Sequence, residues 1–245
     1  MSYLTGFHAI EERIKSGRSA VALLAARAGP RARELMTLAG KYRIPVNRVG
    51  ACDLDRVAPG NRGIALELAD IRESGVRDPA PEEFIAGLGD RPDALVVVLD
   101  EITDPHNYGA ILRSCDQFGV DLVLTRNRRS AKHAGVVART SSGADAWVPA
   151  TEVPNLIRAV QDLKDAGFWI YGADMAGDAV YTKDLCGRAA IILGAEGTGI
   201  SRLLRESCDA LIAIPGEGRI DSLNVSVAAG ILLYEVSRQR SQRRA

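Results

Sequence analysis

The stretch "ALVVVLDEITDPHNYGAILRSCDQFGVDLVLT", residues 94–125, decides the expected fold. It begins with a continuous apolar run at 94–100 and ends with a second run at 121–125. Continuous runs of this kind are typical of parallel strands that are buried on both faces. Between them, apolar residues recur at helical spacing: Tyr108, Ile111, Leu112, Cys115 and Phe118. The stretch therefore predicts two buried strands joined by an amphipathic helix.

The chain after residue 125 continues this alternation. A helical stripe is expected within 153–167, and apolar runs predict three further strands, at 168–174, 189–194 and 210–215. Five strands with helices between them predict a parallel α/β sheet covered on both faces. The stretch 220–236 predicts a last, buried helix with Ser222 as its N-cap. Its apolar stripe is Leu223, Val227, Ile231 and Tyr234, and its small residues at 228–230 suit close helix packing.

The chain before residue 70 predicts a separate small α/β unit. Helices are expected at 8–16 and 30–42, and strands at 20–25, 45–49 and 63–68. A charged, proline-bearing stretch follows, which predicts a linker with a short helix at 81–88. We therefore expect three segments: residues 1–70 as the first domain, 71–92 as the linker, and 93–245 as the second domain.

Composition describes an ordinary globular protein. The 245 residues carry a formal net charge of zero, with 47% hydrophobic and 25% charged residues. Two local patches are basic: five cations and no acid lie between residues 125 and 142, and the C-terminal tail has four unopposed arginines. Such patches fit a localised polyanion site, although for the tail alone a role in solubility is the favoured interpretation. The tail arginines are Arg238, Arg240, Arg243 and Arg244.

The cysteines and the N-terminus limit the compartment and the cofactor. The four cysteines form no CxxC pair and the three histidines are scattered, so no metal site is expected. No signal-peptide core and no apolar run of membrane-spanning length is present. We expect a soluble protein of a reducing compartment, the cytoplasm, with no membrane partner.

Three loops that follow predicted strands carry the polar groups from which a site could be built. Open parallel sheets bind ligands beyond the carboxyl ends of their strands. Neither a GxGxxG fingerprint nor a phosphate-binding GK[ST] loop is present. Glycines at 194, 197 and 199 would let the backbone approach a flat ligand, which suits an adenosine better than a pyrophosphate. The candidate side chains are Asn107, Arg113, Glu196, Ser222 and Asn224.

Together these loops resemble a known family. "DPHNYGAILRS", "LGAEGTGIS" and "IPGEGRIDSLNVSVAAGILLYE" resemble, in order and spacing, the three motifs of the SpoU (TrmH-like) RNA ribose 2'-O-methyltransferases of the SPOUT superfamily. The resemblance spans roughly residues 95–240. In addition, "LTGFHAIEERI" and "NRGIALEL" look like the L30e-like substrate-binding domain that begins some members. The whole length is most similar to the bacterial members that methylate a guanosine of 23S ribosomal RNA.

The resemblance implies a fold, a cofactor and an assembly that periodicity could not indicate. It implies an α/β-knot, in which the C-terminal chain forms a trefoil, and a homodimer through this domain. It implies that backbone at Gly194, Ile214 and Leu223 holds S-adenosyl-L-methionine.

The resemblance also implies a role for each candidate side chain. Asn107, Arg113, Glu196, Ser222 and Asn224 would be catalytic, with Glu196 orienting Arg113. Family proposals let Arg113 accept the ribose proton, but a guanidinium holds its own proton. We therefore expect Arg113 to clamp an RNA phosphate.

Two alternatives remain open at this stage. The first is a transfer-RNA ribose 2'-O-methyltransferase, although the L30e-like front favours ribosomal RNA. The second is a non-catalytic RNA-binding ribosome assembly factor, against which the intact set of five polar residues argues.

Overall fold

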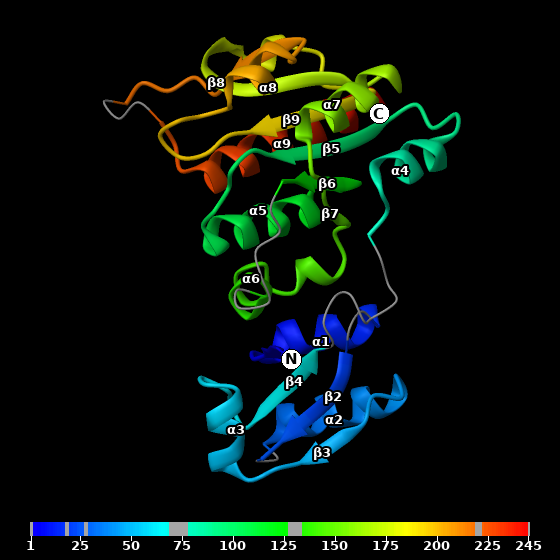
Figure 1. Ribbon diagram of the computed structural model, residues 1–245, viewed down its shortest axis with the longest axis vertical. Coiled ribbons are helices and arrows are strands. Elements are labelled where there is room, and N and C mark those ends of the chain that lie inside the picture. Colours follow the sequence, from blue (N-terminus) through cyan, green and yellow to red (C-terminus); the bar gives the residue numbers. More distant parts are fainter. Residues whose placement is uncertain are drawn as a thin grey trace. The chain divides into compact units, whose positions relative to one another are not determined.

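The computed structural model describes residues 2–17, 20–26, 29–68, 78–126, 134–218 and 222–244. The chain forms two compact units, each with its own sheet (Figure 1). The first unit comprises Met1–Arg77 and Arg129–Trp147, and the second comprises Asp78–Arg128 and Val148–Ala245. No helix of the described chain is both long and apolar enough to span a membrane.

The second unit is built on a six-stranded sheet in which every pairing is parallel. This confirms the predicted parallel α/β architecture. The strand missed by the sequence prediction is β7, which has three residues and so shows no pattern to detect. The strands, in spatial order, are β10 (Ala210–Ala213), β8 (Trp169–Ala179), β9 (Arg188–Leu193), β5 (Ala94–Leu99), β6 (Leu122–Thr125) and β7 (Ala150–Glu152).

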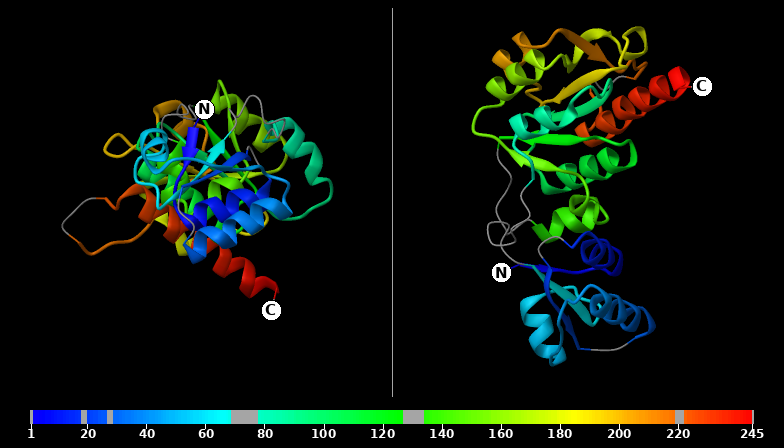
Figure 2. Two further views of the ribbon diagram at one scale, coloured as in Figure 1. Left: turned by 90° about the horizontal axis from the view of Figure 1, so that it is seen from below. Right: turned by 90° about the vertical axis from the view of Figure 1, so that its right-hand side faces the viewer.

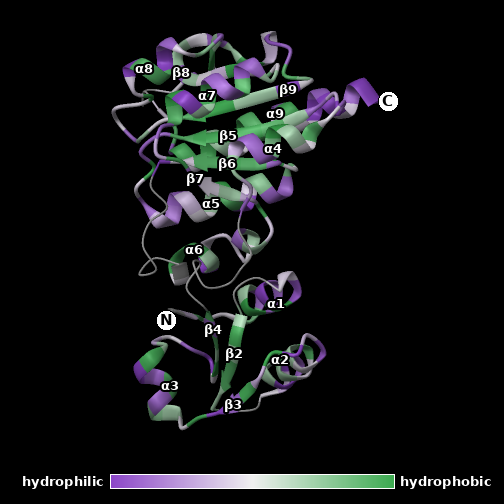
Figure 3. Cartoon of the chain, turned by 45° about the vertical axis from the view of Figure 1, so that its right-hand side comes forward, coloured by the Kyte–Doolittle hydropathy of each residue, from purple (hydrophilic) through white to green (hydrophobic). Residues whose placement is uncertain are grey.

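Helices cover both faces of this sheet (Figure 2). α5 (Pro105–Gln117) and α9 (Val225–Arg244) pack together on one face. α4 (Pro81–Leu88), α7 (Leu156–Asp165) and the short α8 (Arg202–Glu206) cover the other face. The central strands β5 and β6 are hydrophobic along their length (Figure 3), because side chains on both faces are buried.

Helix α4 matches the short helix expected inside the linker. Its Phe84 ring lies 6.4 Å from the ring of Phe168, measured between centroids. Leu88 belongs to the same buried cluster as the α7 side chains. The second unit therefore begins before α4, and residues 78–92 are part of its core packing.

Helix α9 differs from its prediction in two ways. The stripe expected to be buried is exposed: Leu223 at 49%, Val227 at 50%, Ile231 at 38% and Tyr234 at 56%. The buried face carries Leu232, Leu233 and Val236 instead, because a helix with apolar residues all round gives no sequence signal of which side faces the sheet.

The predicted N-cap is also wrong. The cap of α9 is Asn224, not Ser222, because the Asn224 Oδ1 accepts from the Ser226 amide at 2.9 Å. It also accepts from the Val227 amide at 3.4 Å. Asparagine is a preferred N-cap residue, and the helix begins one residue later, at Val225.

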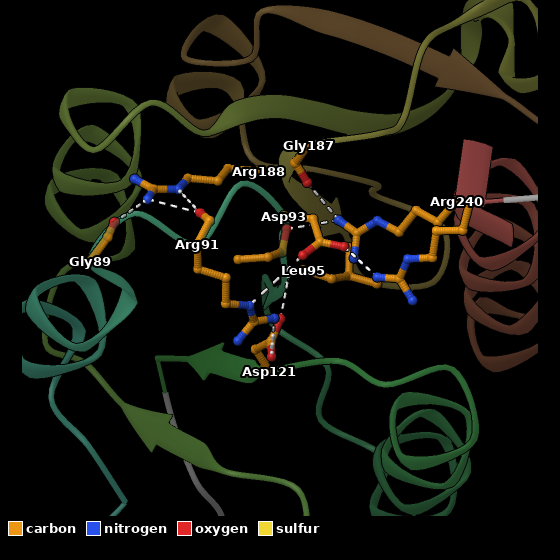
Figure 4. A network of polar contacts seen from close by, with 10 residues as sticks. Gly89, Arg91, Asp93, Leu95, Asp121, Gly187, Arg188 and Arg240 are labelled. Carbon is orange, nitrogen blue, oxygen red and sulfur yellow. Dashed lines mark hydrogen bonds and ion pairs between the residues drawn. The ribbon is translucent and has the colours of Figure 1, made fainter.

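The arginines of the C-terminal tail are not unopposed. Arg238 pairs with Glu235, and Arg244 pairs with Asp93. Arg240 donates from Nη2 to the carbonyl oxygens of Ala94, at 2.9 Å, and Gly187, at 2.7 Å (Figure 4). Burial lowers the pKa of this guanidinium from its ordinary value. The tail therefore binds the amino ends of β5 and β9, and the interpretation as a free basic patch is wrong.

Replacing Arg240 by methionine should destabilise the second unit. The change removes the guanidinium from two carbonyl oxygens, of which that of Gly187 keeps the Ala94 amide as a donor at 3.3 Å. The free energy of unfolding should fall by about 2 kcal/mol. Arg243→Met is the matched control on the same helix, since Arg243 only meets Asp184 at 3.8 Å with both side chains exposed. That exposed pair should contribute less than about 0.5 kcal/mol. Urea titration of both variants measures the difference, and equal midpoints would contradict the assignment.

The first unit contains a four-stranded mixed sheet in the order β1-β4-β2-β3. The sequence predicts its main elements and misses the shortest ones, β1 and α3. Its elements are β1 (Ser2–Leu4), α1 (Phe7–Ser16), β2 (Ala20–Ala25), α2 (Pro30–Lys41), β3 (Val46–Arg48), α3 (Ala51–Val57) and β4 (Ile64–Leu68). The core is formed by α1 and α2 against one face of this sheet.

The first unit also includes a segment from between β6 and β7, namely α6 (Ala134–Thr140) and the 3-10 turn at Ala144–Ala146. Arg13 of α1 forms a mostly buried ion pair with Asp145. The Trp147 indole donates to the Glu12 carboxylate at 3.0 Å.

Of the basic run expected at 125–142, residues 127–133 lie outside the described residues. The rest of the run includes α6, which is packed into the first unit, and the positive charge of the run did not indicate this packing.

Candidate functional site

Three loops of the second unit meet at one hydrogen-bonded cluster, as the sequence predicted. The Asn107 Nδ2 donates to the Glu196 Oε1 at 2.9 Å. The Asn224 Nδ2 donates to the same Glu196 oxygen at 2.8 Å and to the Asn107 Oδ1 at 3.0 Å. We call these three side chains the amide–carboxylate cluster. It joins residues that are far apart in sequence at the carboxyl ends of β5 and β9.

The position of Asn107 follows from how α5 begins. Asp104 is the N-cap, and its carboxylate accepts from the His106 amide at 3.1 Å. Pro105 occupies the first helical position, where its missing N–H costs nothing. Asn107 therefore lies in the first turn, directly after β5, and is only 9% exposed. A polar side chain buried to this extent needs partners, and the cluster supplies them.

The position of Glu196 follows from a tight turn after β9. The Ala195 amide donates to the Gly199 carbonyl at 3.1 Å, and the Gly199 amide donates to the Ala195 carbonyl at 2.9 Å. Gly197 and Gly199 have φ values of 85° and 69°, a region that favours glycine. The turn leaves the Glu196 side chain near its tip, where the two amides reach it.

Two supporting residues were not predicted. Asp100, only 3% exposed, accepts from the Ser201 amide at 2.7 Å and so fixes the far end of the Glu196 turn. The Ser226 hydroxyl donates to the Asn224 Oδ1 at 2.6 Å and holds the Asn224 amide toward the cluster. The sequence offered one signal for each residue. Asp100 is an acidic residue at the end of a buried strand, and Ser226 is a serine two positions after an asparagine cap.

Arg113 and Ser222 lie outside the cluster. Arg113 is on the exposed side of α5, and it has no hydrogen-bond or ion-pair partner among the described residues. Glu196 contacts two amides instead, so the expectation that Glu196 orients Arg113 does not hold in this structure. Ser222 is exposed, beside residues 219–221, which lie outside the described residues. Arg113 is therefore an available cation rather than part of an internal ion pair.

Two of the three backbone positions expected to hold a cofactor adjoin the cluster in sequence: Gly194 lies two residues before Glu196, and Leu223 directly precedes Asn224. A Cβ atom at Gly194 would overlap the backbone of Gly199 and Ile200, so the two arms of the turn approach as only glycine allows. Ile214 is half-buried, and the Leu223 side chain is 49% exposed. Apolar side chains and free backbone groups next to a polar cluster suit a flat, mostly uncharged ligand.

The described part of the chain gives little evidence for a metal site or for a cysteine nucleophile. No group of three or more His, Cys, Asp or Glu side chains there could hold a metal ion. Cys115, on the same helix as Asn107 and Arg113, is fully buried, and burial raises the pKa of its thiol far above the usual value. A buried neutral thiol is not a nucleophile, which confirms the structural role expected for Cys115.

Comparison with known proteins agrees with this geometry. Residues 94–234 match the SpoU rRNA Methylase family, and residues 3–73 match the domain described as RNA 2'-O ribose methyltransferase substrate binding. An uncharacterized tRNA/rRNA methyltransferase of Borreliella burgdorferi is 41% identical over 86% of this chain and 94% of its own length. The 23S rRNA (guanosine-2'-O-)-methyltransferase RlmB of Nitrosomonas europaea is 40% identical over 98% of this chain and 93% of its own.

A solved structure extends the similarity to three dimensions. The SpoU methyltransferase AviRb from Streptomyces viridochromogenes, in complex with the cofactor AdoMet, gives a TM-score of 0.77 at 26% identity. The alignment covers 98% of this chain and 90% of AviRb. The fold and the site thus define an α/β protein whose functional side chains meet beyond the carboxyl ends of a parallel sheet. With a match over more than half of its length, the chain belongs to the SpoU rRNA methylase family.

Proposed function

We propose that this protein transfers a methyl group from S-adenosyl-L-methionine to the 2'-hydroxyl of a ribose in RNA, specifically a guanosine of 23S ribosomal RNA. The observation that carries the proposal is the amide–carboxylate cluster, which joins all three family motifs through Asn107, Glu196 and Asn224. The relatives of similar length that are named for a substrate act on 23S rRNA, and they support this choice.

The residues that would hold the cofactor fit its chemistry. Gly194 lies where the two arms of the 194–199 turn approach most closely, and Ile214 and Leu223, in the loops that carry the third motif, offer apolar side chains. An adenosine needs a flat apolar surface and backbone hydrogen bonds rather than a cationic phosphate cradle. When bound, S-adenosylmethionine supplies a methyl group on a positively charged sulfur.

The protein's own side chains then position the ribose. The Asn107 amide uses both its donor and its acceptor within the cluster, so its role is to fix Glu196 and Asn224. Arg113, exposed and without an internal partner among the described residues, is suited to bind the phosphate beside the target ribose through two parallel N–H donors. Positioning of this kind converts the attack of a weak hydroxyl nucleophile into an effectively unimolecular step. Ser222 is assigned to the same surface as a further contact for the ribose.

Ribosomal RNA is favoured over transfer RNA by the length of the similarity. The RlmB relatives from Nitrosomonas europaea and Pseudomonas aeruginosa match 98% and 96% of the chain, including the first unit. Two solved structures named for tRNA modification match 66% and 62% of it. The full set of Asn107, Arg113, Glu196, Ser222 and Asn224 argues against a non-catalytic assembly factor.

We assign RNA binding and methyl transfer to different parts of the chain. Residues 1–70 bind the RNA substrate, and residues 93–245, onto which α4 of the expected linker packs, bind the cofactor and carry out catalysis. The family match to a substrate-binding domain at residues 3–73 supports the first assignment. Because ribosomal RNA is made and assembled in the cytoplasm, we place the enzyme there.

The second domain is proposed to be a trefoil knot. Strand β10 lies at one edge of the sheet, separated from β5 by β8 and β9. The next helix, α9, nevertheless packs against α5, which follows β5. A chain that returns across the ends of the central strands in this way is what an α/β-knot requires.

The exposed stripe of α9 is proposed to be the homodimer interface. Three large apolar side chains of the helix, Val227, Ile231 and Tyr234, are exposed by between 38% and 56%, and Leu223 just before the helix is exposed by 49%. The Tyr234 ring packs edge-on against Phe118 of α5 at 6.1 Å between centroids, so the surface continues onto the neighbouring helix. A contiguous apolar surface of this kind marks a protein interface, and a C2 dimer covers the same stripe on both copies.

Ile231→Asp should convert the dimer into a monomer, because a carboxylate would be buried in an apolar interface. Ile157→Asp on α7 is the matched control, since both isoleucines are 38% exposed in the single chain. Light scattering should give a dimer for the wild type and for Ile157→Asp, and a monomer for Ile231→Asp. A monomeric wild type, or a dimeric Ile231→Asp, would rule out this interface.

The proposed reaction is tested with unmodified 23S rRNA transcribed in vitro. Incubation with the protein and S-adenosylmethionine should introduce a single 2'-O-methylguanosine, mapped by its resistance to alkaline hydrolysis. A chelator should leave the affinity for S-adenosylmethionine, measured by calorimetry, unchanged, because no metal is proposed. Methylation of a transfer-RNA transcript in place of 23S rRNA would overturn the substrate assignment. Transfer to neither would overturn the enzyme assignment.

A further inference from the structure

The turn between α2 and β3, residues 41–48, presents an aromatic ring between cations. Tyr42 is 47% exposed, although large aromatic side chains are usually buried. Lys41 precedes it and Arg43 follows it, and both are exposed. The Tyr42 side chain takes part in no hydrogen bond or ring contact within the described part of the chain. The ring face is therefore available to a ligand, and the protein's own packing does not explain its presence there.

The backbone of this turn is held rigidly. The Arg43 amide donates to the Gly40 carbonyl at 3.1 Å, and the Ile44 amide donates to the Ala39 carbonyl at 2.9 Å. These two bonds form a Schellman motif, which ends a helix with one left-handed residue. Ile44, 8% exposed, anchors the motif in the core of the first unit. Tyr42 therefore projects from a fixed support rather than from a mobile loop.

The left-handed residue of this motif is an arginine. Arg43 has a φ of 58°, a conformation in which glycine or asparagine is favoured. A side chain with a Cβ atom costs about 1 kcal/mol at such a position. The Arg43 side chain forms no hydrogen bond or ion pair with the described residues that would offset this cost. Strained residues of this kind often serve a function outside the fold.

The charge of the turn is uncompensated. The stretch Lys41–Gly50 contains three cations and no acidic residue. Within the described chain, Lys41, Arg43 and Arg48 form no ion pair. Several other cations of the first unit do have partners: Lys15 pairs with Glu11, Arg31 with Glu34, and Arg56 with Asp53. The turn is therefore an isolated cationic surface around an exposed ring.

We propose that this turn is an RNA-binding platform, in which an unpaired base of the substrate stacks on Tyr42 while Lys41 and Arg43 bind the adjacent phosphates. Arg48, at the end of the edge strand β3, extends the cationic surface along the strand. The inference rests on the proposed function for the identity of the ligand. An exposed aromatic ring flanked by cations is the arrangement that binds single-stranded RNA, since bases in a duplex are already stacked. The bound segment is therefore a loop or bulge.

The stacking contact is tested by three substitutions at one position. Tyr42→Ala should weaken binding to the 23S rRNA transcript about tenfold, the usual size of the effect when a base–aromatic stack is removed. Tyr42→Phe keeps the ring and should bind like the wild type. Tyr42→Leu keeps apolar area without a π face and should bind like Tyr42→Ala. Equal affinity of all three variants and the wild type would overturn the stacking contact.

The phosphate contact is tested by salt dependence, which a purely structural role would not change. Arg43→Asn suits the left-handed backbone and removes the charge. It should reduce the slope of log affinity against log salt by about 0.7 for each phosphate of a single strand that the variant no longer neutralises. Arg56→Gln, whose arginine already pairs with Asp53, is the matched control and should keep the slope. An unchanged slope in Arg43→Asn would overturn the phosphate assignment.

RNA binding and methyl transfer are measured separately, so that failure of the RNA-binding platform can be distinguished from failure of the proposed function. In the platform variants, the KM for RNA should rise while kcat and the affinity for S-adenosylmethionine stay at wild-type values. A wild-type protein that binds RNA but transfers no methyl group would overturn the proposed function and leave the platform standing. A wild-type protein that methylates RNA, with variants of unchanged KM and Kd, would overturn the platform alone.

Discussion

Arg113→Ala is expected to reduce methyl transfer by at least about a hundredfold, the size of effect seen when a charge-stabilising donor is removed from an active site. Affinity for S-adenosylmethionine should stay within about twofold, because the cofactor is assigned to the loops at 194–199 and 214–224, which do not include Arg113. The variant should also fold normally, since an exposed helical side chain leaves no cavity when it is truncated. Single-turnover transfer to the 23S rRNA transcript and calorimetry with the cofactor measure the two quantities.

Two further variants separate charge from geometry. Arg113→Lys keeps the positive charge but loses the planar pair of donors, so it should also be severely impaired if the phosphate is held by two parallel hydrogen bonds. Arg158→Ala on α7 is the control, since Arg158 is also an exposed helical arginine. Near-normal turnover of Arg113→Lys would mean that charge alone suffices. Near-normal turnover of Arg113→Ala would remove Arg113 from the site.

The amide–carboxylate cluster should behave as one unit when it is dismantled. Glu196→Ala removes the acceptor shared by Asn107 and Asn224, and we expect turnover to fall by about a hundredfold. The buried Asn107 amide then lacks one of its partners, so the free energy of unfolding should fall by about 1 kcal/mol. Asn107→Ala should have a similar effect on turnover, because it removes the same hydrogen bond.

The double variant distinguishes a shared role from two separate ones. If the two residues act together, Asn107→Ala combined with Glu196→Ala should be little worse than either single change. Glu206→Ala is the control, because its exposed pair with Arg202 does not reach the cluster. Multiplicative reductions in the double variant would show that Asn107 and Glu196 contribute independently.

The sequence was sufficient for the features that depend on local patterns. Buried strands such as β5 and β9 are continuous apolar runs, and α4 was located to the residue by its proline start and its apolar content. The meeting of Asn107, Glu196 and Asn224 was also predictable. Asn107 and Glu196 follow the neighbouring parallel strands β5 and β9, whose carboxyl ends lie together, and the family motifs marked Asn224 as the third residue to expect there.

The features that the sequence did not predict depend on partners far away in the chain. Three of the four tail arginines are matched by Asp93, Asp184 and backbone carbonyls that lie distant in sequence, so a count of local charge described them as unopposed. Helix α9 is apolar on several sides, and periodicity could not say which side meets the sheet. The crossover with α6 joins the first unit through the Arg13–Asp145 pair, which connects residues that no local pattern links.

Helix α9 is attached at both of its ends, and this has a mechanical consequence. At its start, Asn224 is hydrogen-bonded within the cluster. Near its end, Arg240 donates to backbone carbonyls at the amino ends of the central strands β5 and β9. Between these anchors the helix spans roughly 25 Å, at 1.5 Å per residue. It acts as a strut fixed at both ends, which resists sliding along its axis and turning about it. The Arg240 hydrogen bonds at the amino ends of β5 and β9 therefore help to fix the orientation of the Asn224 amide, although they lie away from the surface where ligands are expected.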